Sequence, residues 1–251
     1  MKNKKLTVIK FGGSLTKNPK AQDKFLKELA VISKKEKIIL VHGGGPEINA
    51  LLNKLNITSK FINGLRHTCA QGLEAVEMAL SAKVNKMITT KLLKYGASAV
   101  GISGKDGASV ICKPVKDLGF VGEPVKINKH LIDTLLKGNF LPVVSSVCAD
   151  AKMQGLNVNA DSLASALAVA FKADKLIFLT DVAGVLNADK KTIPELQLSK
   201  INELIKQGVV TGGMIPKIQG CAESIKKGVK EVWIINGAEG IKKMKGTVIK
   251  K

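Results

Sequence analysis

The chain has 251 residues, of which 45% are hydrophobic and 24% charged, a balance that excludes a disordered protein and suits a globular one. Its formal net charge of +20 comes from lysines spread along the whole chain, with 4% aromatic residues and a single arginine, Arg66. Because nucleic-acid readers favour arginine and use aromatic side chains for stacking, we interpret the charge as a solvated surface and expect no nucleic-acid partner.

Short apolar runs alternate along the chain with longer amphipathic segments, which is the pattern of a parallel sheet covered by helices. The expected strands are Leu6–Phe11, Lys37–Val41, Ala97–Ile102, Phe140–Ser145, Lys175–Leu179 and Val229–Ile235. The expected helices are Ala21–Lys34, Glu47–Leu55, Gln71–Tyr95, His130–Leu136, Asp161–Ala173, Ile201–Gln207 and Pro216–Lys227. We therefore predict an α/β fold, a three-layer αβα sandwich with a mainly parallel central sheet.

The stretch from about Lys105 to Gly155 differs, because glycines and prolines separate short β-like pieces. We expect hairpins that decorate the main sheet there. No linker or repeat divides the chain, so we predict one domain over residues 1–251. Within it, a boundary near residue 172 would separate an N-terminal acceptor lobe (1–172) from a C-terminal nucleotide lobe (173–251).

The cysteines and the chain's N-terminus bear on the cellular setting. Cys69, Cys112, Cys148 and Cys221 are far apart in sequence and form no CxxC pair, so we expect reduced structural thiols and no protein-held metal. No apolar run is long enough to cross a bilayer, and the basic start is followed by a short strand-like run instead of a signal peptide. We expect a cytoplasmic protein with no membrane partner.

The first glycine cluster, Lys10-Phe11-Gly12-Gly13-Ser14, lies at the end of the first expected strand. Open α/β sheets bind ligands beyond the carboxyl ends of their strands. Glycines at that edge let backbone N–H groups approach a phosphate, and Lys10 would add a positive charge. Taken alone, the cluster is equally consistent with an ordinary turn.

The second cluster, His42-Gly43-Gly44-Gly45-Pro46, follows the second expected strand. Three successive glycines are entropically costly, and Pro46 suits the first turn of the next helix, whose free N–H groups would face an anion. We interpret His42 as a loop or packing residue. Neither cluster matches a Walker A loop or a GxGxxG fingerprint, which disfavours an ATP enzyme of the P-loop or Rossmann type.

Seven short motifs follow one another between roughly residues 7 and 235. They are Lys10-Phe11-Gly12-Gly13, His42-Gly43-Gly44-Gly45-Pro46-Glu47-Ile48, Gly64-Leu65-Arg66, Ser103-Gly104-Lys105-Asp106-Gly107, Asn157-Val158-Asn159-Ala160-Asp161, Thr180-Asp181-Val182-Ala183-Gly184-Val185 and Gly213-Met214-Ile215-Pro216-Lys217. In this order they resemble the amino acid kinase family, and most closely its N-acetylglutamate kinases. The resemblance implies ATP-dependent phosphorylation of the side-chain carboxylate of N-acetyl-L-glutamate, a small acidic substrate, in arginine biosynthesis.

The resemblance gives catalytic roles to Lys10, Lys217 and Asp161. The two lysines would stabilise the transferring phosphoryl group from opposite sides, and Asp161 would hold both ammonium groups in position. Gly12 and Gly13 would bind phosphate oxygens. The reaction needs no general base, because a carboxylate with a reference pKa of about 4.3 is already ionised at neutral pH.

Arg66 also acquires a role from the resemblance. An acceptor amino acid carries a second carboxylate that must be held without reacting, and the planar fork of arginine binds a carboxylate through two hydrogen bonds. Asn157 and Asn159 would line the same pocket, and Gly44 and Gly45 would bind the reacting carboxylate. We therefore expect these five residues to form the acceptor site.

The nucleotide site implied by the resemblance follows the fifth expected strand and precedes the last helix. Its residues are Asp181, Val182, Ala183, Gly184, Val185, Leu186, Val209, Val210 and Thr211. ATP and Mg²⁺ are the expected cofactors. Phosphates and water would provide most of the metal ligands, because the sequence shows no dedicated cage of carboxylates.

The sequence departs from the family pattern in places. Arg66 is followed by His67-Thr68-Cys69, where the family usually has Val-Thr-Asp, and Gly237–Lys251 is divergent. Fewer than ten residues precede Lys10, too few for the extra helix that builds the hexamers of arginine-inhibited members. We expect an arginine-insensitive homodimer with Gly72–Tyr95 as its interface, which light scattering can check.

Two other functions remain open on the sequence alone. A related kinase acts on aminoadipate or glutamate held by an acidic carrier protein, and a charge of +20 would suit such a partner. Gly45, Lys105 and the segment from Asn157 to Asp161 favour a free acceptor instead. The second alternative is a nucleic-acid-binding protein on an inactive kinase scaffold, against which the intact catalytic residues argue.

Overall fold

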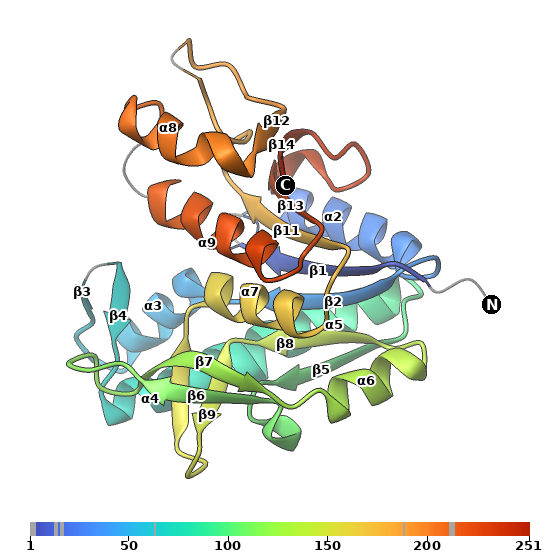
Figure 1. Ribbon diagram of the computed structural model, residues 1–251. Helices are drawn as coiled ribbons and strands as arrows, with labels where there is room; N and C mark the ends of the chain where they lie inside the picture. The colour runs from blue at the N-terminus through green and yellow to red at the C-terminus, as the bar shows by residue number, and fades with distance from the viewer. Residues whose placement is uncertain (1–3, 13–14, 16–17, 63, 188, 211–213) are drawn as a thin grey trace.

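One large sheet runs through the centre of the molecule (Figure 1). The computed structural model describes residues 4–12, 15, 18–62, 64–187, 189–210 and 214–251. The strands of the sheet are β1 (Leu6–Phe11), β2 (Lys37–His42), β5 (Ala99–Ser103), β8 (Leu141–Ser145), β11 (Lys175–Thr180), β12 (Glu195–Gln197), β13 (Glu231–Asn236) and β14 (Gly246–Lys250). Their order is β12-β14-β13-β11-β1-β2-β8-β5.

The sheet is mainly parallel, as predicted. All pairings from β13 across to β5 are parallel, and β14 runs antiparallel to β13. The six predicted strands are present, with ends that move by up to two residues. The sheet crosses the predicted lobe boundary near residue 172, because β1 pairs with β11. The division into lobes itself stays a prediction.

Helices cover both faces of the sheet and complete the predicted three layers (Figure 1). The α-helices are α2 (Pro19–Ile32), α3 (Gly45–Lys54), α4 (Ala70–Glu77), α5 (Asn85–Lys94), α6 (His130–Lys137), α7 (Ala160–Ala170), α8 (Ile201–Lys206) and α9 (Met214–Lys226). Short 3₁₀ turns are η2 (Asp106–Ala108), η3 (Leu198–Lys200) and η4 (Gly237–Glu239). Successive residues of a strand point to opposite faces of the sheet and so belong to different cores. Val8 belongs to the core that includes residues of α6, α7 and α9, and Ile9 belongs to the core that includes residues of α2 and α5.

Hairpins occur between residues 105 and 155 as expected, but they pair with each other into a separate four-stranded barrel. Its strands are β6 (Val110–Pro114), β7 (Val121–Ile127), β9 (Val147–Asp150) and β10 (Gly155–Val158). β6 with β7 and β9 with β10 form two antiparallel hairpins. Parallel pairing of β6 with β9 and of β7 with β10 closes the barrel. Buried Cys112, Cys148 and Leu156 belong to the core at this barrel. The strands therefore pair with one another and do not extend the main sheet.

Two further features were not predicted. A short hairpin, β3 (Lys60–Ile62) and β4 (Leu65–His67), stands apart from both sheets. The expected helix Gln71–Tyr95 is continuous, but its middle, η1 (Met78–Val84), is a π-helix. Such segments are commonly found at functional sites. Asn85 follows η1, and its buried amide donates to the backbone carbonyl of Val143.

Gly101 on β5 lies directly against this part of the helix. A Cβ at Gly101 would overlap Asn85 Oδ1 and would lie 2.6 Å from Thr89 Oγ1. We expect Gly101→Ala to lower the free energy of unfolding by about 1–3 kcal/mol, because the added methyl overpacks a filled space. Urea denaturation measures the change.

The matched control is Gly220→Ala in α9, where an added Cβ meets nothing within 4 Å. Because alanine favours a helix interior over glycine, this variant should gain up to about 1 kcal/mol. Loss of stability in both variants, or in neither, would contradict the assigned packing of Gly101.

Candidate active site

A cavity of about 480 Å³ lies at the carboxyl ends of β1 and β2, beside the start of α7. Seven residues that the sequence predicts for the site line it: Lys10, Gly44, Gly45, Arg66, Asn157, Asn159 and Asp161. They come from four segments far apart in sequence. The parallel sheet brings the ends of β1 and β2 together, and the β3–β4 hairpin and the barrel strand β10 contribute Arg66 and Asn157. The structure thus gathers these residues, and their individual roles stay predictions.

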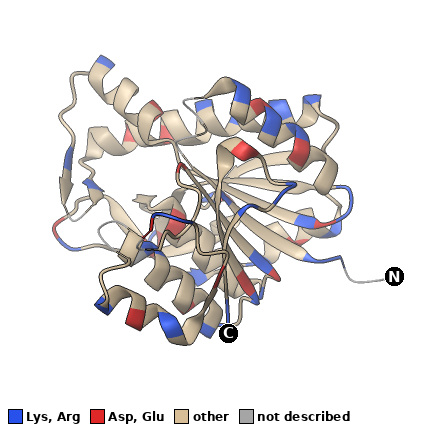
Figure 2. Cartoon of the chain, turned by 90° about the horizontal axis from the view of Figure 1, so that it is seen from above, with Lys and Arg blue, Asp and Glu red and all other residues tan. Residues whose placement is uncertain are grey.

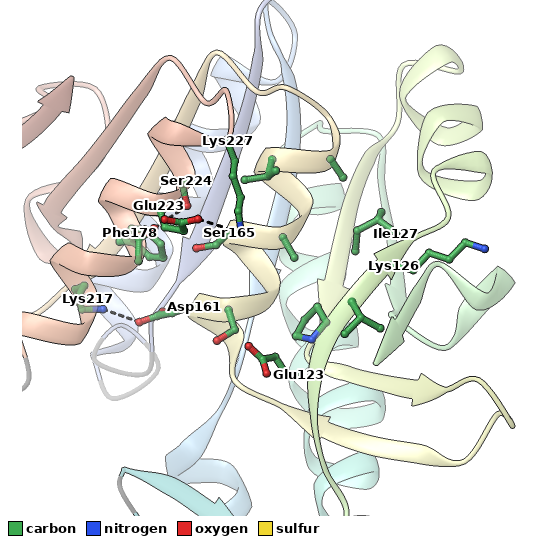
Figure 3. A pocket seen from close by; sticks show the side chains of 17 residues that line it. Glu123, Lys126, Ile127, Asp161, Ser165, Phe178, Lys217, Glu223, Ser224 and Lys227 are labelled. Atoms are coloured by element: carbon green, nitrogen blue, oxygen red, sulfur yellow. Dashed lines mark hydrogen bonds and ion pairs between the residues drawn. The ribbon is translucent and has the colours of Figure 1, made fainter. Parts of the chain in front are cut away.

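Asp161 joins two lysines at the edge of this cavity. It lies in the first turn of α7, where Asn159 caps the helix by accepting from the backbone N–H groups of Asp161 at 2.8 Å and Ser162 at 3.2 Å. Lys217 Nζ donates to Asp161 Oδ2 at 2.6 Å (Figure 3), and Lys10 Nζ lies 3.0 Å from Oδ1. The Lys10 contact lacks hydrogen-bond directionality at Oδ1, so it is an electrostatic contact.

Opposing effects set the protonation state of this carboxylate. Burial raises the pKa of Asp161, but the neighbouring charges of Lys10 and Lys217 lower it by more, so that the net pKa lies below its ordinary value. Its place at a helix N-terminus also favours the anion. Asp161 therefore remains ionised at neutral pH. Two ammonium groups against one carboxylate leave a net positive charge at the cavity.

Lys217 has a second neighbour besides Asp161. It lies in the first turn of α9, and its Nζ is 5.3 Å from the centre of the Phe178 ring on β11. Figure 3 shows the Lys217–Asp161 pair at one end of a groove between α7, α9 and β7. The pair therefore stands where this groove and the main cavity meet, because Asp161 lines both.

Arg66 lies in β4 and is almost completely buried. Its guanidinium donates to the hydroxyl of Ser59 and, at 2.6 Å, to Asn49 Oδ1, and it lies 4.6 Å from the centre of the Phe61 ring. Burial lowers the pKa of Arg66, although the group stays charged at neutral pH. No carboxylate among the described residues pairs with it. The arrangement orients a positive charge that only neutral groups hold.

Sequence reasoning missed these three partners of Arg66. Phe61 belongs to the unpredicted hairpin, Ser59 to the loop before it, and Asn49 to a helix that was expected without a role for this residue. The sequence feature that could have indicated these partners was Arg66 itself. A buried guanidinium needs acceptors, and these can be sought among the polar residues of adjacent segments.

The two predicted asparagines differ in what they leave free. Asn157 Nδ2 donates to Thr68 Oγ1 at 3.1 Å, and Thr68 Oγ1 donates to the Arg66 carbonyl at 3.0 Å, which ties β10 to β4. The oxygen of Asn159 is taken by the helix cap. Its amide nitrogen is therefore the group that remains for a ligand.

The first part of the predicted nucleotide segment begins where β11 ends. Asp181, Val182, Ala183 and Leu186 are exposed, and Gly184 and Val185 are buried. A Cβ at Gly12 would lie 2.5 Å from the Leu179 carbonyl oxygen, so the end of β11 touches the first glycine cluster. The segment thus lies next to Gly12, and nucleotide binding by it stays a prediction.

The second part of that segment follows α8. Val210 is buried, and it belongs to the same core as Val185. The side chains of these two residues are therefore not available to a ligand. Val209 is partly buried. Thr211 and, from the first glycine cluster, Gly13 lie outside the described residues.

His42 ends β2 directly beneath the second glycine cluster. It is fully buried, and its Nδ1 lies 2.9 Å from the Gly43 carbonyl oxygen. Burial lowers the pKa of His42 to about 4, although the bond to Gly43 acts in the opposite direction. The imidazole is therefore neutral at physiological pH.

The described part of the chain lacks two further kinds of feature. No three histidine, cysteine, aspartate or glutamate side chains among the described residues converge as a metal site would require. No helix there combines the length and the apolar character needed to span a bilayer.

The sequence pattern that describes the amino acid kinase family matches residues 5–236. The chain belongs to the amino acid kinase family. Within this family, it is 65% identical over 246 residues to acetylglutamate kinase of Endomicrobium trichonymphae, which covers 98% of this chain and 99% of that protein.

Other relatives agree. Acetylglutamate kinase of Clostridioides difficile is 42% identical over 239 residues, covering 93% of this chain and 84% of that protein. The crystal structure of smu.665 from Streptococcus mutans superposes with a TM-score of 0.85 at 33% identity, covering 98% of both chains. The fold predicted for a member of the amino acid kinase family is therefore confirmed.

The burial of His42 gives a testable pH dependence. Its pKa falls from an ordinary value of 6.5 to about 4 on folding, so the unfolded chain binds this proton first as the pH is lowered. Stability that is complete above pH 6.5 should therefore decline between pH 6.5 and 4, with a loss of roughly 2 kcal/mol from this residue at pH 5.

Urea denaturation at pH 7 and pH 5 measures the loss in the parent protein and in His42→Asn, which has no titratable group at this position. The variant should lose less stability than the parent by that amount. Equal losses in the two proteins would contradict a depressed pKa for His42.

Proposed function

We propose that the protein transfers the γ-phosphoryl group of ATP to the side-chain carboxylate of N-acetyl-L-glutamate, giving N-acetyl-L-glutamyl 5-phosphate in arginine biosynthesis. The observation that carries the proposal is the pair of lysines held on Asp161, a residue that lines the same cavity as Lys10 and Arg66. Identity of 65% to an acetylglutamate kinase over nearly the whole chain supports the choice of acceptor.

The main barrier to the reaction is the repulsion between the acceptor carboxylate and the phosphoryl group, which are both anionic. Positively charged groups in the site lower this repulsion. Two unit charges about 4 Å apart repel by about 4 kcal/mol at an effective dielectric constant of 20. Lys10 and Lys217 would offset this repulsion around the transferring group. A carboxylate oxygen of the acceptor forms the new bond to phosphorus, and the bond from phosphorus to the bridging oxygen breaks, leaving its electron pair on ADP.

Asp161 would organise the lysines and would not act as a base. Both of its oxygens are engaged, and the acceptor carboxylate has no proton to give at neutral pH. Arg66 would bind the second carboxylate of the acceptor, since Ser59, Asn49 and Phe61 already fix the orientation of its fork. Gly12, Gly44 and Gly45 would supply backbone N–H donors.

The described residues offer Mg²⁺ little direct coordination. Asp161 is the only carboxylate among the described residues that line the cavity, and its oxygens already face lysines. Mg²⁺ would therefore be held mainly by the phosphates of ATP and by water, where it neutralises phosphate charge. The residues that follow β11 and α8 would bind the nucleotide.

The proposal includes a homodimer of cytoplasmic chains. Its interface would be the helical run from α4 to α5, in which Met78 and Leu93 are 50% and 51% exposed. Large apolar side chains left in solvent on one helical run are consistent with a surface that a second copy covers.

A hydroxylamine-trapping assay tests the function. With ATP and Mg²⁺, N-acetylglutamate should yield an acyl phosphate that hydroxylamine converts to a hydroxamate, and free glutamate and aspartate should yield far less. The same assay with glutamate or aminoadipate on a carrier protein separates the related reaction. Absence of product from N-acetylglutamate would refute the proposal.

Substitutions separate the two ends of the site. Arg66→Lys should raise the KM for N-acetylglutamate by about 10- to 100-fold with a smaller effect on kcat, because lysine cannot reproduce the fork. Lys217→Ala should lower kcat by about 10²- to 10³-fold, because its charge acts on the transferring group.

The control is Lys226→Ala, at the exposed end of α9, the helix that also carries Lys217. This variant should behave as the parent. Steady-state kinetics with each substrate varied gives both parameters. Equal changes in kcat and KM in the Arg66 and Lys217 variants would undo the division of roles.

A further inference from the structure

The tautomer of His42 is fixed by its neighbours. A carbonyl oxygen can only accept a hydrogen bond, so the 2.9 Å contact to the Gly43 carbonyl places the ring proton on Nδ1. Nε2 is then an acceptor, and it lies 3.0 Å from Asn85 Nδ2. Both ring nitrogens are therefore engaged, in complementary senses.

The orientation of the Asn85 amide is equally determined. Its Nδ2 is also within hydrogen-bond distance of the carbonyls of Ile102 at 3.1 Å and Val143 at 2.9 Å, so its two N–H bonds are shared among three acceptors. Exchanging nitrogen and oxygen would set an oxygen against both carbonyls, so only one orientation is favourable. Asn85 thus presents a donor to His42 Nε2 and selects the Nδ1–H tautomer.

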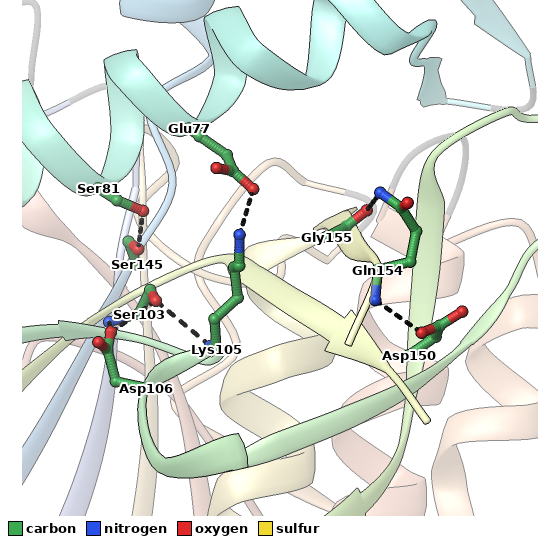
Figure 4. Close-up of polar contacts among 9 residues, drawn as sticks. All are labelled: Glu77, Ser81, Ser103, Lys105, Asp106, Ser145, Asp150, Gln154 and Gly155. Carbon is green, nitrogen blue, oxygen red and sulfur yellow. Dashed lines mark hydrogen bonds and ion pairs between the residues drawn. The ribbon is translucent and has the colours of Figure 1, made fainter. Parts of the chain in front are cut away.

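The π-helix η1 holds this arrangement against the glycine loop. Ser81 Oγ lies 2.8 Å from Ser145 Oγ at the end of β8 (Figure 4). A Cβ at Gly44 would lie 2.8 Å from Leu80 Cδ2 and 3.3 Å from Val84 Cγ2. Side chains of η1 and the residue that follows it therefore contact β8, His42 and the loop together.

The planar peptide between Gly43 and Gly44 links the His42 ring to the direction of the Gly44 N–H. In a planar trans peptide, the carbonyl of Gly43 and the N–H of Gly44 point in opposite directions. The buried ring of His42 holds that carbonyl on the side of the core, so the Gly44 N–H is turned toward the cavity that Gly44 lines. Within the described part of the chain, no backbone carbonyl accepts a hydrogen bond from this N–H.

We propose that His42 is a positioning residue for the acceptor: its Nδ1–H, selected by Asn85, aims the Gly44 N–H at the carboxylate that receives the phosphoryl group. The inference rests on the proposed function and assigns a task to a residue that the sequence marked only as packing. Because the ring remains neutral at physiological pH, it supplies a fixed direction to the backbone and no charge.

Two substitutions separate the bonds made by the ring. The side-chain nitrogen of His42→Asn can occupy the place of Nδ1 and keep the donor to the Gly43 carbonyl. The side-chain oxygen of His42→Gln can instead occupy the place of Nε2 and keep the acceptor for Asn85. The two variants have the same functional group and remove the same ring.

We expect His42→Gln to raise the KM for N-acetylglutamate by about tenfold, as for loss of a donor to a charged group, and His42→Asn to stay within about threefold of the parent. The KM for ATP should change little in either. The control His130→Gln, at an exposed position, should match the parent. Equal KM values for N-acetylglutamate in the two His42 variants, or a larger value in His42→Asn, would overturn the proposal.

The tautomer can be read without any variant at position 42. Long-range ¹H–¹⁵N spectra of the parent protein should show one histidine with its proton on Nδ1, and His67→Gln and His130→Gln identify it by removing the other two signals. A proton on Nε2 would overturn the proposal even if neither His42 variant folds. Lack of activity of the parent toward N-acetylglutamate would instead refute the proposed function, and the spectra would remain interpretable.

Discussion

The contact of Asp161 with two lysines is the interaction on which the site depends. Lys10 comes from the end of β1, Asp161 from the start of α7 and Lys217 from the start of α9, so one carboxylate joins three elements. Without this anion, two ammonium groups directed at one point would repel each other. The strand order brings the backbone of the site together in a similar way. Because β1 lies between β2 and β11, the ends of these two neighbouring strands lie beside Lys10.

The acceptor side of the cavity is organised in a different way. There the fixed element is a guanidinium supported by Ser59, Asn49 and the face of Phe61, with no opposing carboxylate in the described structure. A charge supported only by neutral groups keeps its full attraction for an anion, whereas pairing with a carboxylate offsets part of it. The two sides of the cavity thus combine a partly compensated cluster, in which two lysines share one carboxylate, with an uncompensated guanidinium.

Much of this could be predicted from the sequence, because strands and amphipathic helices have periodic patterns. Leu6–Phe11 has the same limits in prediction and structure, and the glycine clusters lie where strand ends predicted them. The π-helix was not foreseen, since a seven-residue change of helical pitch inside a long amphipathic run leaves no compositional mark. The closed barrel was missed for another reason: its parallel pairing of β6 with β9 joins residues almost forty positions apart.

At the site itself, glycine and charge patterns identified groups but not their supports. Arg66 was conspicuous as the only arginine, yet nothing in the order of residues linked it to Asn49. His42 was visible in its motif, but its partner Asn85 lies 43 residues away in sequence. Contacts of this kind depend on how helices pack against strands, which a single sequence does not specify.

The single buried arginine contrasts with a surface whose positive charges are lysines. In Figure 2 the positions of lysine and arginine are distributed over many elements, and all of these residues but one are lysines. In water an ammonium serves almost any purpose that a positive charge requires. At position 66, two acceptors and an aromatic face must be met by one planar group, and lysine has no such shape. The composition of this protein therefore distinguishes places where only the sign of a charge matters from the place where its geometry does.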